Sequence, residues 1–557
     1  MATAALRALE RLKYEFGDEA AARRLQLLRQ LDRARLRTAG QVLRLHELLC
    51  FARACPDDAA VLRQAAAMLD GFDRRADLRA LRHELGDSGI AGTAITYPFF
   101  AATAARLAQR WPAQLRIVWD DDEHARLDRL LQTMSLWSET PGLDELPLGT
   151  REWVDAQRGD STDAAYVVRR VQAAHPDPFA FERAYEDLQL WLELAPGADT
   201  PSRSRACAPV RAVQFQRAPL RAARPDLAQV LQERPRAVRM LSPKDGARYV
   251  ELARDAMVTR SRDLDAFAYG SARDVRLIDW EDGLQFAAIG MVPERRLMLE
   301  AVYGFLTLRN GVPMGYVLNS ALFGSAEIAY NVFDTFRGGE AGHVYGRVLA
   351  TVRHLFGTDS FTIYPYQLGD DNDEALQSGA WWFYQKLGFR ARDRAVLARM
   401  QKELAAMRRR SGHRSSIATL RALATENVYY HMGEPRDDVI GLLPLANVGM
   451  AVTRMLARRF GADRERAAAE CTAAAAKLLG VARPAALPAG ERLWFERWAP
   501  LVAVLPGVER WPAADREALG AVMRKKGARS ESGFARAFDA HPRLRRAVAQ
   551  LARSGGE

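Results

Sequence analysis

The hydrophobic pattern of this chain changes near its middle, and that change constrains the folds it can adopt. From about residue 6 to residue 85, apolar residues recur every three or four positions, which predicts amphipathic helices. Residues 284–333 instead show strand-like segments separated by short turns. The helical period returns after Phe389. The chain is therefore predicted to be an α+β protein, with a mixed central sheet between largely helical flanks.

The length of the chain predicts several domains. At 557 residues it is too long for one hydrophobic core. Residues 1–200 are expected to form a mainly helical region with one or two subdomains. A stretch rich in proline, serine and arginine breaks the periodicity near residue 200, so residues 201–239 are interpreted as a linker and join. Residues 240–400 then form the central domain, and residues 401–557 a helical C-terminal region.

Two turns stand out in the central region. Asn310 and Gly311 separate two predicted strands, 297–308 and 312–323, and favour a tight hairpin turn. A further strand, 327–333, leads into the turn Arg337-Gly338-Gly339-Glu340-Ala341-Gly342, which precedes an amphipathic helix. Glycines let backbone amides point into one space, and a helix N-terminus adds positive potential. The glycine turn therefore predicts either a cradle for a pyrophosphate or a structural helix cap.

A second signal follows the next predicted strand, at residues 377–389. This segment reads Gln-Ser-Gly-Ala-Trp-Trp-Phe-Tyr-Gln-Lys-Leu-Gly-Phe. It resembles the signature Asn-x-x-Ala-x-x-x-Tyr-x-Lys-x-Gly-Phe of the GNAT superfamily of acyl-coenzyme A dependent acyltransferases. The residues that fit are Ala380, Tyr384, Lys386, Gly388 and Phe389, while Gln377 stands where asparagine is usual.

The glycine turn is a variant of the loop of that superfamily, Gln/Arg-x-x-Gly-x-Gly/Ala. Starting the loop at Arg337 puts Glu340 at the glycine position. Starting it at Phe336 puts Gly339 and Ala341 correctly but loses the polar first residue. The order of hairpin, strand, glycine turn, helix, strand and helix supports the resemblance, which is confined to the central part of the chain.

The resemblance implies an N-acetyltransferase that moves an acetyl group from acetyl-coenzyme A to an amine of unknown identity. In that interpretation the loop amides and Arg337 hold the pyrophosphate, and the strand before the loop pairs with the pantetheine arm. The implied cofactor-binding residues are Asn331, Val332, Phe333, Arg337, Gly338, Gly339, Ala341, Gly342, Gln377 and Ala380.

Acetyl transfer also needs an acid for the departing thiolate and a base for the amine. Tyr384 is the candidate general acid, because a phenol can donate its proton as the carbon-sulfur bond breaks. Packing in the aromatic core is the alternative for this side chain. Glu327, Asp334 and Glu340 are candidate bases, with a surface charge or a helix-start acid as the alternative for each.

Other functions and partners remain open at the level of sequence. The variant loop also fits a GNAT-fold binding or regulatory protein without catalysis. The basic run 390–414 raises a third candidate, an aminoacyl-tRNA-dependent transferase, although a nucleic-acid partner is not favoured over a solvated helix. Sparse cysteines and the lack of a long apolar stretch predict a cytoplasmic protein without a membrane segment. The acidic run 120–123 is interpreted as helix capping, so no metal is predicted.

Overall fold

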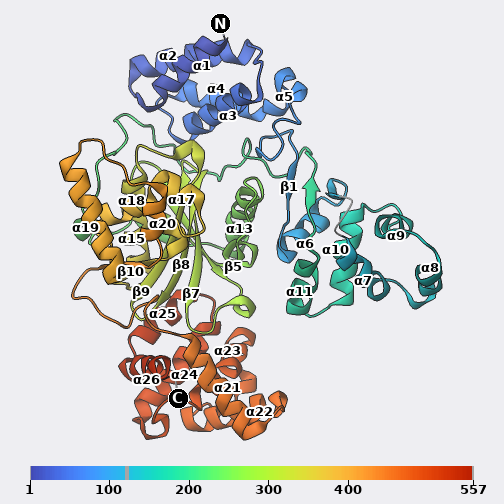
Figure 1. Cartoon of the computed structure of the whole chain (residues 1–557), viewed down its shortest axis with the longest axis vertical. Coiled ribbons are helices and arrows are strands. Elements are labelled where there is room, and N and C mark those ends of the chain that lie inside the picture. Colours follow the sequence, from blue (N-terminus) through green and yellow to red (C-terminus); the bar gives the residue numbers. More distant parts are fainter. Residues whose placement is uncertain (1, 120–123, 555–557) are drawn as a thin grey trace. The chain divides into compact units, whose positions relative to one another are not determined.

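The computed structural model describes residues 2–119 and 124–554, and the chain divides into two compact units (Figure 1). The first unit comprises Met1–Pro219, Arg248–Tyr269 and Arg309–Pro313. The second comprises Leu220–Ala247, Gly270–Leu308 and Met314–Glu557. The division at residues 219 and 220 falls inside the predicted join. Mixed helices and strands confirm the predicted α+β class.

The first unit contains two separate hydrophobic cores. One belongs to a helical bundle whose leucines recur at helical spacing, including Leu28, Leu31, Leu45 and Leu49, all fully buried. Its helices are α1 (Ala2–Arg11), α2 (Asp18–Arg33), α3 (Ala39–Ala54), α4 (Ala59–Asp70) and α5 (Ala76–Ala80). The bundle agrees with the helical periodicity predicted for this stretch.

The second core of this unit lies between helices and a small sheet. The sheet is antiparallel, in the order β1 (Ile95–Tyr97), β3 (Leu192–Leu194), β2 (Leu115–Ile117). The sequence also predicts a short strand at residues 115–119, which corresponds to β2, but it does not predict β1 or β3, because three-residue strands are too short to show alternation. The helices are α6 (Ala101–Arg110), α7 (Ala125–Met134), α8 (Thr140–Glu145), α9 (Thr150–Gln157), α10 (Asp163–Ala174), α11 (Pro178–Leu188) and α14 (Asp265–Ala268). The acidic run 120–123, interpreted as capping, lies outside the described residues.

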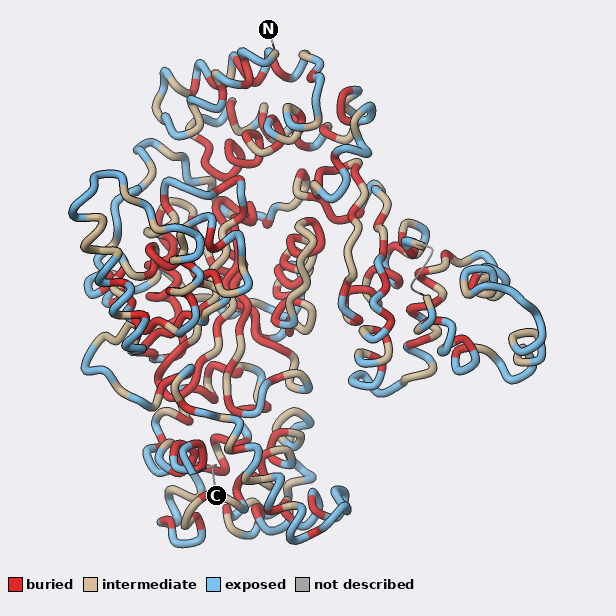
Figure 2. Tube along the Cα trace, in the orientation of Figure 1, coloured by how far each residue is buried: buried red, intermediate tan, exposed pale blue. Residues whose placement is uncertain are grey.

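A nine-stranded sheet forms the centre of the chain. Its order is β11 (Arg390–Ala391), β12 (Val428–His431), β10 (Ser360–Ile363), β9 (Ser325–Val332), β8 (Val312–Leu322), β7 (Ala301–Arg309), β6 (Leu284–Met291), β5 (Gly270–Asp279) and β4 (Ala237–Met240). The strands are among the most buried parts of the second unit (Figure 2). Asn310 and Gly311 both have positive φ, 46° and 78°, as a tight turn between β7 and β8 requires.

Helices surround this sheet and continue to the end of the described chain. Around the sheet are α12 (Leu227–Val230), α15 (Ala341–Phe356), α16 (Pro365–Leu368), α17 (Asp373–Ser378), α18 (Ala380–Lys386), α19 (Arg394–Arg409) and α20 (Ile417–Leu423), whereas α13 (Pro243–Val258) spans the division between the two units. Beyond one end of the strands lie α21 (Ala446–Phe460), α22 (Arg464–Leu479), α23 (Ala489–Val502), α24 (Ala513–Gly527), α25 (Ser532–Asp539) and α26 (Pro542–Arg553). No helix of the described chain is both long and apolar enough to cross a membrane.

Two parts of the sheet lie outside the predicted central domain. β12 falls within residues 401–557, predicted as helical, and inserts between β10 and β11. β4 begins in the predicted join, ends at the first residue of the predicted central domain and pairs with β5. Both strands have four residues, and only pairing with a longer neighbour distinguishes such segments from loops.

The C-terminal helices are fastened to the sheet by a buried polar network. The Lys526 ammonium lies 2.5 Å from the Glu531 carboxylate, and both side chains are inaccessible to solvent. Tyr303 of β7 donates a 2.5 Å hydrogen bond to Asp274 of β5, and the backbone amide of Ser532 donates to the Tyr303 hydroxyl at 2.9 Å. Buried charges require such partners, so α24 and α25 have a fixed position on these strands.

Candidate functional site

The site begins where two neighbouring strands stop pairing. β9 and β10 are parallel, and their register runs through Ser325–Ser360 and Ala326–Phe361 to Glu327–Thr362. β9 continues for five residues beyond that point, whereas β10 ends at Ile363. On its other side, β9 stays paired with β8 as far as Val332 and Gly315. From residue 328 onward, β9 therefore has one paired edge and one edge without a strand beside it.

The backbone groups that face this open edge follow from strand geometry. Phe333 donates its amide to Met314 on the β8 side, at 2.8 Å. Backbone groups of successive residues in a strand point to opposite sides. Those of Tyr330 and Val332 therefore point to the open edge. An extended ligand can pair there with the backbone of Tyr330 and with the Val332 amide, while the Val332 carbonyl already accepts a hydrogen bond from Arg337 Nε at 3.2 Å.

The glycine turn follows directly after β9 and leads into a helix without a side-chain cap. Gly338 and Gly339 are exposed and have φ values of 95° and 53°, a left-handed conformation that favours glycine. The first intrahelical bond of α15 runs from the Val344 amide to the Glu340 carbonyl. The first amides of an α-helix have no intrahelical partner. At the described N-terminus of α15, no side-chain cap accepts from them. Such an end attracts anions.

A carboxylate from the turn between β5 and β6 fixes the orientation of α15. Glu281 accepts a hydrogen bond from Arg347 Nε at 2.7 Å, and His343 Nε2 lies 3.1 Å from the same oxygen. One turn further on, Thr351 accepts a 2.9 Å hydrogen bond from Trp280 Nε1. His343, Arg347 and Thr351 are four residues apart and share one face of the helix. These contacts hold the N-terminal end of α15 in place.

Three tyrosines from three elements meet beside this helix end. The ring centroids of Tyr330 on β9 and Tyr345 on α15 are 5.1 Å apart, and those of Tyr345 and Tyr384 on α18 are 5.5 Å apart. The Tyr330 hydroxyl also lies 3.5 Å from the carbonyl of Ala341 in the first turn of α15. The glycine turn and the Tyr384 ring thus belong to one side of the sheet.

Burial controls the chemistry of these phenols. Tyr384 is only 3 % exposed, and desolvation raises its pKa, so the phenol stays protonated at neutral pH. The Tyr384 hydroxyl has no hydrogen-bond partner among the described residues. The Tyr345 hydroxyl is also buried, and it has no hydrogen-bond partner in the part of the chain that the structure describes. Tyr384 is therefore both packed in an aromatic cluster and able to donate a hydrogen bond.

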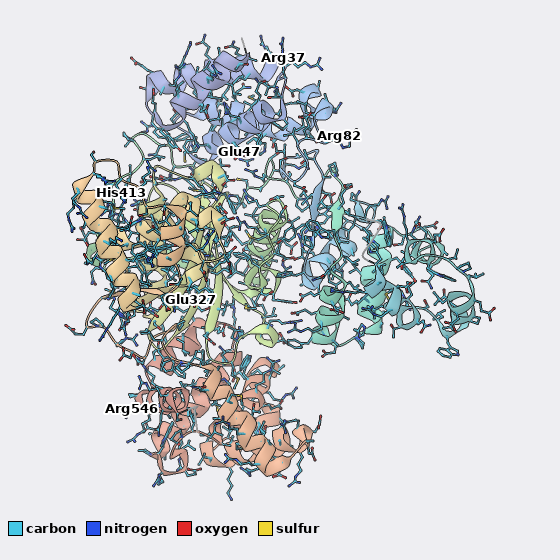
Figure 3. All side chains as sticks on the ribbon, viewed as in Figure 1. Arg37, Glu47, Arg82, Glu327, His413 and Arg546 are labelled. Carbon is cyan, nitrogen blue, oxygen red and sulfur yellow. The ribbon has the colours of Figure 1, made fainter. Side chains whose placement is uncertain are left out.

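Glu327, labelled in Figure 3, lies at the fork between β9 and β10. Its register partner Thr362 is paired in turn with Tyr429 of β12, so these three side chains form a row on one face. Burial and the charge of Glu300 raise the pKa of the Glu327 carboxyl. Tyr330, three residues further along β9, points to the other face.

The other candidate bases have structural partners. Glu340 is 5 % exposed, and its carboxylate accepts from the backbone amide of Arg221 at 3.3 Å. Asp334 is an exposed acid 2.8 Å from Arg337. The Arg337 guanidinium also pairs with Glu374 on α17, and its Nε donates to the Val332 carbonyl. These contacts order the loop, and the roles predicted for Asp334, Arg337 and Glu340 stay predictions.

The remaining predicted residues are spread around the same end of the sheet. Asn331 is partly buried, and its side-chain oxygen has no partner among the described residues, while Phe333 is buried. Gly342 is so close to Pro225 that an added Cβ would lie 3.3 Å from its ring. Gln377 is exposed on α17, and Ala380 begins α18.

Sequence reasoning missed the residues that organise this site. In the sequence, residues 279–283 predict only a turn that enters a strand, and the partners of Glu281 on α15 are more than sixty residues away. Tyr330 and Tyr345 carry no motif of their own. The signal that could have indicated them is weak: an aromatic residue lies on each side of the glycine turn in the sequence.

Comparison of the chain with protein-family models, with curated proteins and with solved structures returns no match.

The interaction of Glu281 with α15 makes a pH-dependent prediction. Burial opposes ionisation, but the hydrogen bond from His343 and the Arg347 guanidinium outweigh it and lower the pKa of Glu281 to about 2. A depressed pKa stabilises the fold above the unfolded value near 4.5, and the contribution disappears as pH falls toward 2. Glu281→Gln is expected to lower the free energy of unfolding by about 2 to 3 kcal/mol at pH 7, and by less than half of that at pH 3.

Urea denaturation at the two pH values measures this difference. Asp282→Asn is the control, because its partly exposed carboxylate pairs with Arg221 at 3.1 Å. An equal loss of stability at pH 7 and pH 3 for Glu281→Gln would contradict the assigned ion pair.

Proposed function

We propose that the second unit is an acetyl-coenzyme A dependent N-acetyltransferase. The observation that carries this proposal is the open edge of β9, which leads directly into a glycine turn and an uncapped helix. A thioester carrier needs both features, an extended groove for the pantetheine amides and an anion site for the pyrophosphate. Their order along one strand matches the order of these groups in the carrier.

The carrier lies along the open edge, with its pyrophosphate at the amides of residues 338–342. Its pantetheine arm pairs with the backbone of Tyr330 and with the Val332 amide. A backbone amide of this segment also polarises the thioester carbonyl, so that negative charge is stabilised when the amine attacks. The thioester sulfur then lies nearer the fork, on the side where Tyr384 packs.

The reaction proceeds through attack of a neutral amine on the carbonyl carbon. Glu327 takes a proton from the amine, and its raised pKa makes it a better base than an ordinary surface carboxylate. The new carbon-nitrogen bond forms as the carbon-sulfur bond breaks, and Tyr384 donates a proton to the thiolate. Because Glu327 and Tyr384 lie on opposite faces, the amine enters from the Glu327 face and the carrier occupies the Tyr384 side.

A cytoplasmic location is part of this proposal. Cys50, Cys55, Cys207 and Cys471 are all free thiols, and Cys207 is exposed. Acetyl-coenzyme A and unpaired cysteines are both compatible with a reducing compartment.

Binding of the carrier is expected to stabilise the protein against heat. Acetyl-coenzyme A should raise the unfolding temperature of the wild-type protein, and Gly339→Glu should abolish that increase by placing a carboxylate at the pyrophosphate position. Gly357→Glu is the matched control, because Gly357 has a φ of 79° at the other end of α15 and no atom near its Cβ position. Loss of the increase in both variants, or no increase in the wild-type protein, would contradict the assigned pyrophosphate site.

Removal of the Tyr384 hydroxyl is expected to slow the chemistry without changing carrier binding. Tyr384→Phe should lower thiol release from acetyl-coenzyme A in the presence of a panel of primary amines by about 100-fold. The thermal response to acetyl-coenzyme A should stay as in the wild type.

Tyr430→Phe is the control for this variant, because Tyr430 belongs to the same aromatic cluster through Phe389 at 5.7 Å. Full activity of Tyr384→Phe would remove this phenol from the mechanism. Carrier binding without thiol release in the wild-type protein would favour the regulatory alternative.

A further inference from the structure

The C-terminal helix α26 borders a groove that is separate from the acyltransferase site. The groove has a volume of about 900 Å³. Its lining includes Arg545, Arg546 and Arg553 of α26 and the acids Asp437, Asp438 and Asp539. A groove of this size is large enough for a metabolite as big as a nucleotide.

Two of the carboxylates in this groove are already neutralised by ion pairs. Asp437 lies 2.5 Å from Arg392. Asp438 lies 2.5 Å from Arg436 and 2.6 Å from Arg545. Arg545 also donates to the carbonyl of Phe323, so its guanidinium is occupied.

Asp539 has a different environment at the base of the groove. Burial raises its pKa to about 6, while Arg545, the backbone amide of Gly324 and Arg436 lower it and Asp359 raises it further. One of its oxygens is buried without a hydrogen-bond partner among the described residues.

The other two arginines that line the groove are Arg546 and Arg553. Both are exposed, and within the described chain neither makes an ion pair or a hydrogen bond. They are seven residues apart, which is about two turns, so they lie on the same face of α26 with Gln550 between them. Arg546 projects from this helix in Figure 3.

We infer that the α26 groove binds a small organic phosphate, held by Arg546 and Arg553. Guanidinium groups bind phosphate oxygens in a bidentate manner, and two long side chains on one helix face can converge on a single phosphate. Gln550 then faces the uncharged body of the ligand. A carboxylate ligand would offer fewer acceptor oxygens to the same pair of arginines.

The test measures thermal stabilisation and affinity with defined probes. Inorganic phosphate, glucose 6-phosphate and adenosine 5′-monophosphate are added to the full chain at constant ionic strength, with acetate as the carboxylate control. The organic phosphates are expected to raise the unfolding temperature most, and Arg546→Gln/Arg553→Gln should weaken their binding about tenfold or more.

A second double variant controls for net charge. Arg543→Gln/Arg464→Gln also removes two positive charges, one of them on α26, but Arg543 pairs with Asp515 and neither residue borders the groove. This variant should bind the probes as the wild type does. Equal weakening in both double variants, or no stabilisation by any phosphate, would overturn the proposal.

The Gly339→Glu variant separates this groove from the acyltransferase site. It should respond to glucose 6-phosphate as the wild type does, whatever its response to acetyl-coenzyme A. Loss of both responses in Gly339→Glu would assign phosphate binding to the glycine turn instead of to α26.

Discussion

The early end of the parallel pairing between β9 and β10 is the constraint on which the rest of the site depends. Three register pairs join the strands, and after Glu327 and Thr362 only β8 continues beside β9. A strand edge without a neighbour exposes amides and carbonyls that must be satisfied by water or by a ligand. Here that edge begins at a half-buried carboxylate and ends at a glycine turn, so backbone recognition and anion recognition follow one another along a single segment.

Contacts from outside that segment hold α15 and the glycine turn in position. Glu281 and Trp280 hold α15 through His343, Arg347 and Thr351, and Arg337 ties the loop to Asp334 and Glu374. Because α15 is held in a fixed position, its N-terminal amides and its dipole stay directed at one place. An anion bound there is stabilised without reorganisation of the helix. The aromatic cluster contributes in another way, because it excludes water around Tyr384 and raises the pKa of that phenol.

Much of the fold was predictable from the sequence because its signals are local. Helical period in the flanks, the Asn310-Gly311 turn and the strand before the glycine turn all follow from neighbouring residues, and the structure confirms them. β12 and two strands of the small sheet, β1 and β3, were missed, since strands of three or four residues depend on partners distant in sequence. The candidate site was only partly predictable for the same reason. The sequence pointed to Tyr384 and the glycine turn, but Glu281 and Tyr345 act only through tertiary contacts.

Hydrogen-deuterium exchange with and without acetyl-coenzyme A tests the open edge of β9 most directly. Bound carrier is expected to slow exchange of the Tyr330 and Val332 amides and of the amides in residues 338–343, with little change in β6 and β7. Protection confined to other segments, or unchanged exchange along β9 at saturating carrier, would contradict the account.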